Sequence, residues 1–190
     1  MTLDIWQYIN FNRATRENRE NAAIWMLDHP EVLPNLINTL DGSTAHTALK
    51  EDALQVKTAY ILEMMAVKDL NSLTPELPHL ARFLPHLNSD SIQRALLHIM
   101  TLWLAPIESL DIIDQKAIEV LTEHCFDKLI KKPEVAVAVQ AHAMSCLYYL
   151  SRVNSWIREP LADILIKQMP GKSPGYQARA KHILRQLNQV

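Results

Sequence analysis

Hydrophobic and polar positions along this chain recur with a long period. Leucine occurs at four positions spaced 44 residues apart, Leu33, Leu77, Leu121 and Leu165. The positions two residues further on are polar in every case: Asn35, His79, Glu123 and Lys167. Two residues correspond to about 200° around an α-helix, so each pair places one side chain in the core and the other toward solvent. The pattern predicts four equivalent helices with a buried leucine ridge and an exposed polar ridge.

A second series of apolar positions predicts another set of helices between the leucine-containing ones. Its members recur at i, i+4, i+7 and i+11, which lie on one face of an α-helix. The four sets are Leu54, Thr58, Ile61 and Met65; Ile92, Leu96, Ile99 and Trp103; Val137, Ala141, Met144 and Tyr148; and Tyr176, Ala180, Ile183 and Leu187. We interpret the two series as the first and second helices of stacked helical pairs.

Proline and turn-forming residues divide the chain into short segments. The dipeptides His29-Pro30, Thr74-Pro75, Lys132-Pro133 and Ser173-Pro174 each predict a helix start, since proline suits the first helical turn. The breaks between segments are too short for an interdomain linker. We therefore expect residues 1–190 to form a single domain. The expected fold is all-α, a right-handed α-solenoid of about four helical pairs with a C-terminal capping helix.

Composition supports this fold class and excludes several kinds of site. The 190-residue chain is 48% hydrophobic, which is enough to bury a substantial core, and contains only 3 glycines. So few glycines argue against a glycine-rich phosphate loop and against a β-fold with many tight turns. Cys125 and Cys146 lie inside helical patterns, so we expect two buried thiols. With no signal segment and no long apolar run, the expected location is cytoplasmic, with no membrane contact.

The charges are unevenly distributed, although the formal net charge at pH 7 is only −2. Residues 1–127 contain 9 lysine and arginine residues against 18 aspartate and glutamate residues, whereas residues 128–190 contain 10 against 3. The basic C-terminal end could attract an anionic partner. The alternative is a solvated terminal repeat, because no basic run there is longer than Lys131-Lys132.

Several segments resemble small bacterial HEAT-like (armadillo-type) helical repeat proteins. These segments are TAYILEMM, LTPELPHLARFLPHL and SDSIQRALLHI in the first half, and VAVQAHAMSCLYYLSR and SPGYQARAKHILRQL in the second. The resemblance covers roughly residues 22–188 and implies an all-α superhelix, with no family-wide catalytic residues. Some proteins of this group are automatically named adenylosuccinate lyase. Within MPGKSP, Met169, Pro170 and Lys172 match that lyase's MPxKxNP loop, but the asparagine is absent and Pro174 is one place early.

Candidate catalytic and metal-binding residues do not form complete sets in the sequence. His142 and Cys146 share a helix face, as do His79 and His86, but neither pair has a third ligand. Neither a GxSxG motif nor a phosphate-binding glycine motif is present. The sequence therefore predicts no catalytic residue, no cofactor and no metal site. The four tryptophans, Trp6, Trp25, Trp103 and Trp156, are expected in the core.

The sequence favours a non-catalytic scaffold that binds a protein or peptide, because solenoids present extended surfaces to partners. If the second helices line the inside of the curve, a mixed-charge groove is expected there. Its predicted residues are Glu31, Asn35, His79, Arg82, Glu119, Glu123, Asp163 and Lys167. Two alternatives stay open: a lyase-type enzyme, and nucleic-acid binding through the basic C-terminal end at Lys172, Arg179, Lys181 and Arg185. The acidic character of the second helices argues against nucleic acid, and the sequence leaves the oligomeric state open.

Overall fold

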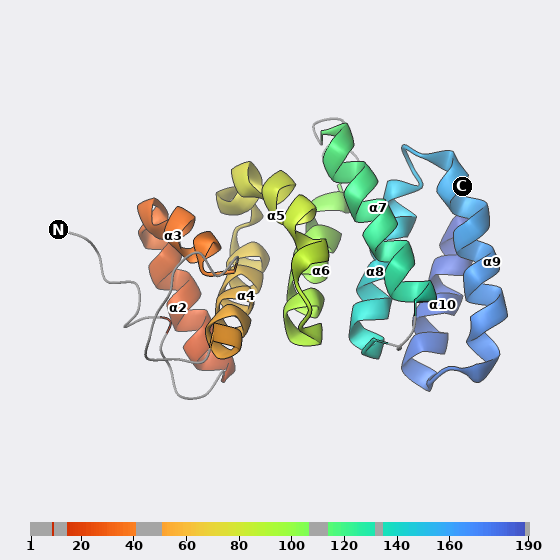
Figure 1. The fold of residues 1–190 in the computed structure, drawn as a ribbon, viewed down its shortest axis with the longest axis horizontal. Coiled ribbons are helices and arrows are strands. Elements are labelled where there is room, and N and C mark those ends of the chain that lie inside the picture. The colour runs from red at the N-terminus through yellow and green to blue at the C-terminus, as the bar shows by residue number, and fades with distance from the viewer. Residues whose placement is uncertain (1–8, 10–14, 41–50, 107–113, 132–134, 189–190) are drawn as a thin grey trace.

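The computed structural model describes residues 9, 15–40, 51–106, 114–131 and 135–188, which are helical with short connections and contain no β-strand (Figure 1). The α-helices of this part are α2 (Arg16–Asp28), α3 (Leu33–Asn38), α4 (Glu51–Lys68), α5 (Leu77–Phe83), α6 (Asp90–Leu104), α7 (Gln115–Ile130), α8 (Val137–Leu150), α9 (Arg158–Gln168) and α10 (Pro174–Leu187). Short 3₁₀ segments are Pro30–Val32, Leu70–Glu76, Leu84–His86, Ser155–Ile157 and Met169–Gly171. The all-α class expected from the sequence is confirmed for these residues.

The helices pack in two rows that run along the long axis of the molecule. In the first row α2 contacts α4, α4 contacts α6, α6 contacts α8, and α8 contacts α10. In the second row α5 contacts α7, and α7 contacts α9. Figure 1 shows the helices side by side in chain order, from α2 at one end to α9 and α10 at the other. Residues far apart in the chain can therefore meet along either row.

Side chains at several helix starts satisfy backbone N–H groups that have no partner within the helix. Thr15 Oγ1 accepts from the N–H of Asn18 at 3.2 Å, and Asp114 Oδ1 accepts from that of Ala117 at 2.9 Å. At α10, Ser173 accepts from Tyr176 at 3.4 Å, as Ser173-Pro174 predicted.

Two of the predicted proline starts are displaced. Pro30 begins a 3₁₀ segment and Pro75 lies inside one, while α3 and α5 begin at Leu33 and Leu77. A second proline near the start of each α-helix, Pro34 or Pro78, has no N–H to donate to the preceding turn, so the α-helical bonding pattern cannot extend backward through it. The start predicted at Lys132-Pro133 lies outside the described residues.

Three of the four leucines of the 44-residue spacing are buried as predicted. Leu77, Leu121 and Leu165 are 0%, 1% and 0% exposed. Leu33 is only half-buried, and the core positions beside it are Val32, Leu36 and Ile37. The 3₁₀ segment before α3 changes the helical phase, because a 3₁₀ turn contains three residues rather than 3.6.

The first-row series is confirmed in α4, α6 and α10, where all its members are buried. In α8 the prediction is confirmed for Met144 and Tyr148, which are buried, but Val137, the first residue of the helix, is exposed and Ala141 is half-buried. Val139, Ala143 and Cys146 are buried as well. The middle of α8 is therefore buried on more than one face, which a pattern of a single apolar face does not predict.

Polar contacts also join the two rows inside the core. The buried Gln93 of α6 donates from Nε2 to the carbonyl oxygens of Leu84, at 3.0 Å, and Leu87. Its Oε1 lies 2.7 Å from Nε2 of His124 on α7, so the histidine donates in this contact. Burial lowers the pKa of His124 to about 4, which keeps the ring neutral at pH 7.

Cys125 and Cys146 are buried free thiols, as predicted. Cys125 on α7 lies beside Cys146 on α8, and burial raises the pKa of Cys125. Cys146 Sγ lies 3.6 Å from the carbonyl oxygen of Leu97. Both side chains therefore fill the contact between neighbouring helices.

Candidate functional site

The predicted binding residues of the second row all have exposed side chains. Exposed residues include the four ridge positions Asn35, His79, Glu123 and Lys167. The flanking residues Glu31, Arg82, Glu119 and Asp163 are exposed as well. Exposure is the geometric condition that a binding ridge must meet; the common groove and its partner stay predictions.

Local ion pairs neutralise the two cations of this ridge. Arg82 Nη1 lies 2.7 Å from Asp114 Oδ2, and Lys167 Nζ lies 3.9 Å from Asp163 Oδ2. Glu119 accepts a hydrogen bond from Gln115 at 3.1 Å, which leaves its negative charge in place. The charge that remains for a partner is therefore negative, and two of its three carboxylates, Glu119 and Glu123, lie on α7 while the third, Glu31, precedes α3.

A cleft of about 510 Å³ opens beside this negative charge, and we call it the acidic cleft. Its lining residues are Gln115, Glu119, Thr122, Glu123, Phe126, Asp127, Asn154 and Trp156. Glu119, Glu123 and Asp127 are spaced four residues apart on one face of α7. Among the described residues, no lysine or arginine lines the cleft, although Lys131, one turn along α7, pairs with Asp127.

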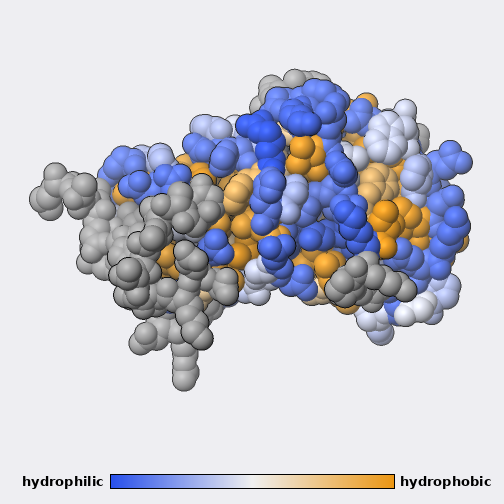
Figure 2. Space-filling view, in the orientation of Figure 1, coloured by the Kyte–Doolittle hydropathy of each residue, from blue (hydrophilic) through white to orange (hydrophobic). Residues whose placement is uncertain are grey.

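Two aromatic side chains also line the acidic cleft. Trp156 is 61% exposed, and its ring lies 6.0 Å from that of Phe126 with an interplanar angle of 24°. Figure 2 shows hydrophilic side chains along α7 with hydrophobic surface between α7 and α9. The cleft thus combines carboxylates with an accessible aromatic surface, an arrangement that suits a cationic group.

Trp156 is a correction to the sequence-based expectation that the tryptophans are core residues. It lies in the 3₁₀ segment Ser155–Ile157, where Ile157 is fully buried instead. Trp103 is buried as predicted and Trp25 is half-buried, while Trp6 lies outside the described residues. The sequence contained one signal that Trp156 is exposed: it follows Asn154, beyond the end of α8, where the helical apolar pattern no longer applies.

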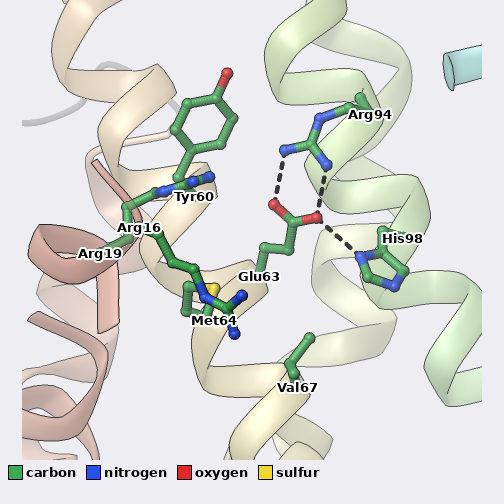
Figure 3. Close-up of a pocket in the computed structure, with 8 residues that line it drawn as sticks. All are labelled: Arg16, Arg19, Tyr60, Glu63, Met64, Val67, Arg94 and His98. Carbon is green, nitrogen blue, oxygen red and sulfur yellow. Dashed lines mark hydrogen bonds and ion pairs between the residues drawn. The ribbon is translucent and has the colours of Figure 1, made fainter. Parts of the chain in front are cut away.

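A second cleft, of about 550 Å³, lies among three helices of the first row, and we call it the arginine cleft (Figure 3). Arg16 and Arg19 come from α2, Tyr60, Glu63, Met64 and Val67 from α4, and Arg94 and His98 from α6. None of these residues was predicted to form a site. The sequence contained one signal of this cleft: the spacing of Tyr60, Glu63, Met64 and Val67 places these four side chains on one face of α4.

Glu63 joins α4 to α6 at the centre of the arginine cleft. Its two carboxylate oxygens accept from the two Nη atoms of Arg94, each at 2.7 Å, and Oε1 also accepts from Nδ1 of His98 at 2.8 Å (Figure 3). The Glu63 side chain is only 8% exposed. Burial would raise its pKa, but the hydrogen bonds and positive charge of His98 and Arg94 outweigh burial and hold the pKa at about 2.

Aromatic contacts extend this arrangement to both neighbouring helices. The guanidinium groups of Arg19 and Arg94 lie 5.1 and 5.3 Å from the centre of the Tyr60 ring. The ring of His98 stacks on that of His142 in α8, with 4.8 Å between the ring centres. Burial, together with the charge of nearby His98, lowers the pKa of His142 to about 4. His142 is therefore neutral at pH 7.

The four basic residues predicted at the C-terminal end make different contacts. Lys172 lies over the Tyr176 ring at 4.9 Å, and Arg179 extends toward α8, where Nη1 lies 3.4 Å from Ser145 Oγ. Lys181 and Arg185 are exposed on another side of α10. The Met169, Pro170 and Lys172 positions of the lyase-like match belong to the connection between α9 and α10.

Searches for metal ligands, for membrane-spanning helices and for similar proteins assign no function to the described residues. Within the described ranges, no three histidine, cysteine, aspartate or glutamate side chains converge to hold a metal ion. No helix in the same part of the chain is long and apolar enough to span a bilayer. No protein-family model, curated protein or solved structure matches this chain.

Proposed function

We propose that this chain is a HEAT-like repeat protein, a right-handed solenoid of four helical pairs capped by α10, that binds a partner protein and catalyses no reaction. The arrangement in two rows supports the proposal, because α2, α4, α6 and α8 are each followed in the chain by a second helix, and α10 comes last. Such arrays present extended surfaces on which each repeat adds a few contacts.

The acidic cleft is the observation on which the binding function rests. Exposed tryptophan is frequent at the energetic centres of protein interfaces, and Trp156 is held against Phe126 at the edge of three carboxylates. A lysine or arginine of the partner would meet both an aromatic ring and negative charge there. We therefore propose a partner with a basic segment. The remaining ridge residues, from Glu31 to Lys167, would extend the contact along the second row.

The two alternative functions have weaker support. Carboxylates along α7 would repel nucleic-acid phosphates from this face, and the basic residues near α10 point in different directions. For a lyase, the residues that match its loop serve to join α9 to α10, with Ser173 capping the latter helix. Neither alternative explains the exposed ring of Trp156.

Trp156→Ala should weaken binding of a labelled arginine- and leucine-containing peptide by at least about tenfold, since removal of an interface tryptophan often costs about 2 kcal/mol or more. Glu119→Gln combined with Glu123→Gln should weaken binding and reduce its salt dependence, because two attractive charges are lost. Fluorescence anisotropy of the peptide measures both effects.

Two controls separate the cleft from general charge. Glu17→Gln combined with Glu159→Gln removes two exposed carboxylates outside the cleft and outside the predicted ridge, and should leave the affinity nearly unchanged. A peptide with glutamate in place of each arginine should not bind. Equal losses of affinity in both glutamine double variants, or equal binding of both peptides, would contradict a specific site for cationic groups.

A further inference from the structure

The arginine cleft concentrates positive charge in the half of the molecule that is otherwise acidic. Residues 1–127 contain only 9 lysine and arginine residues against 18 acidic ones. Three of those cations, Arg16, Arg19 and Arg94, line this one cleft, and among the described lining residues Glu63 is the single carboxylate. The overall charge of this half predicts the opposite sign, so the local excess comes from how α2, α4 and α6 are packed.

Glu63 neutralises only one of the three arginines. Both of its oxygens are engaged by Arg94, one of them also by His98, and its side chain is almost fully buried. Within the described residues, no hydrogen bond joins Glu63 to Arg16 or Arg19. Among the described residues, Arg19 forms no ion pair, and Arg16 pairs only with Glu20, at the surface of α2.

Arg16 and Arg19 each donate a hydrogen bond from Nε, and their terminal Nη atoms stay available to a ligand. Arg16 Nε donates to Glu20 at 2.7 Å, and Arg19 Nε donates to the Thr15 carbonyl oxygen at 3.3 Å. In the described structure neither residue has a hydrogen bond from a terminal Nη atom. The Arg16–Glu20 pair is a surface contact, with the Arg16 side chain 83% exposed, so a ligand can compete with it at low cost.

The walls of the cleft resemble those of small-molecule sites, which are mostly apolar with a few charged groups that fix orientation. Tyr60, Met64 and Val67 supply apolar surface on α4, and Val67 is 55% exposed. The volume of about 550 Å³ falls within the range of roughly 300–1,000 Å³ usual for such sites. Because Tyr60 and Thr15 already orient Arg19, binding requires little side-chain ordering.

We propose that the arginine cleft binds a small oxyanion that bears two or more negative charges, with Arg16 and Arg19 donating hydrogen bonds to it. Paired guanidinium groups suit phosphate or carboxylate oxygens through charge-assisted hydrogen bonds. The site is separate from the acidic cleft, which lies in the second row and has the opposite charge.

The test is calorimetric titration of the full chain with pyrophosphate and with citrate near physiological ionic strength. Binding of both defines a general oxyanion site, and binding of only one identifies phosphoryl or carboxylate chemistry. Arg16→Gln combined with Arg19→Gln should reduce the affinity at least tenfold, since both charge-assisted hydrogen bonds to the anion are removed.

Lys181→Gln combined with Arg185→Gln provides the matched control, because it removes the same charge from exposed positions of α10. This control should change the affinity by less than about twofold, as salt screens charges that are far from the cleft. Circular dichroism confirms that each variant folds. Absence of binding by either anion, or equal losses in the two double variants, would overturn the proposal.

Discussion

Replacing Leu77 or Leu121 with alanine should lower the free energy of unfolding by about 2–5 kcal/mol, the usual cost of truncating a buried leucine. The two side chains are 0% and 1% exposed, in α5 and α7, which contact each other in the second row. Each substitution removes apolar contacts and leaves a cavity that tightly packed helices fill only partly. Urea denaturation monitored by circular dichroism measures the change.

Ile166→Ala is the matched control for this measurement. Ile166 is adjacent to the buried Leu165 of the leucine series but is 56% exposed, so its truncation should cost far less than either core change. An unfolding midpoint that stays at the wild-type value in both leucine variants would contradict the packing of the second row.

Much of the fold could be predicted because burial in a helix leaves a periodic record in the sequence. Leu77, Leu121 and Leu165 are buried and the polar positions two residues on are exposed, since about 200° separates them on each helix. The prediction failed at Leu33 and Val137, which lie close to helix starts. A 3₁₀ turn comes directly before Leu33 and changes the helical phase, and Val137 is the first residue of α8. At such positions helical periodicity does not predict whether a side chain faces the core.

The two clefts were harder to predict because each is assembled from residues far apart in the chain. Glu119 and Glu123 were predicted, but their aromatic neighbour Trp156 comes from the segment after α8. Arg19 and Arg94 meet at the same tyrosine ring, yet 75 positions separate them in the sequence. One signal was available: a glutamate within the apolar run TAYILEMM must find a cationic partner when the helix is buried on that face.

The rows of helices give the molecule two chemically different surfaces. Carboxylates of α7 point into the second-row cleft, whereas arginines of α2 and α6 point into the first-row cleft. Pairing within each row explains the difference, because α4 supplies a carboxylate that satisfies only α6, while the cations of the second-row ridge are matched locally by Asp114 and Asp163. The proposed cationic segment and the proposed anion would therefore bind to separate surfaces of the same chain.

Glu63→Gln should destabilise the protein by about 2 kcal/mol at pH 7, and this difference from the wild type should shrink as the pH falls below about 4.5. The folded protein lowers the pKa of Glu63 from 4.5 to about 2, so the stabilisation is present above the unfolded value and is lost as the pH falls toward the folded value. A tenfold change in the acid dissociation constant corresponds to about 1.4 kcal/mol. We reduce the resulting energy because water screens the Arg94 and His98 side chains, which are 29% and 30% exposed.

Urea denaturation of the wild type and the variant at pH 7 and pH 3 gives the loss of unfolding free energy caused by the substitution at each pH. The effect is the difference between these two losses. That form is necessary because other carboxylates also contribute to acid unfolding of both proteins. Glu159→Gln, which removes an exposed carboxylate of α9, should follow the wild type at both pH values. If Glu63→Gln instead loses stability equally at pH 7 and pH 3, the carboxylate acts through packing rather than charge, and its ion pair with Arg94 does not stabilise the contact between α4 and α6.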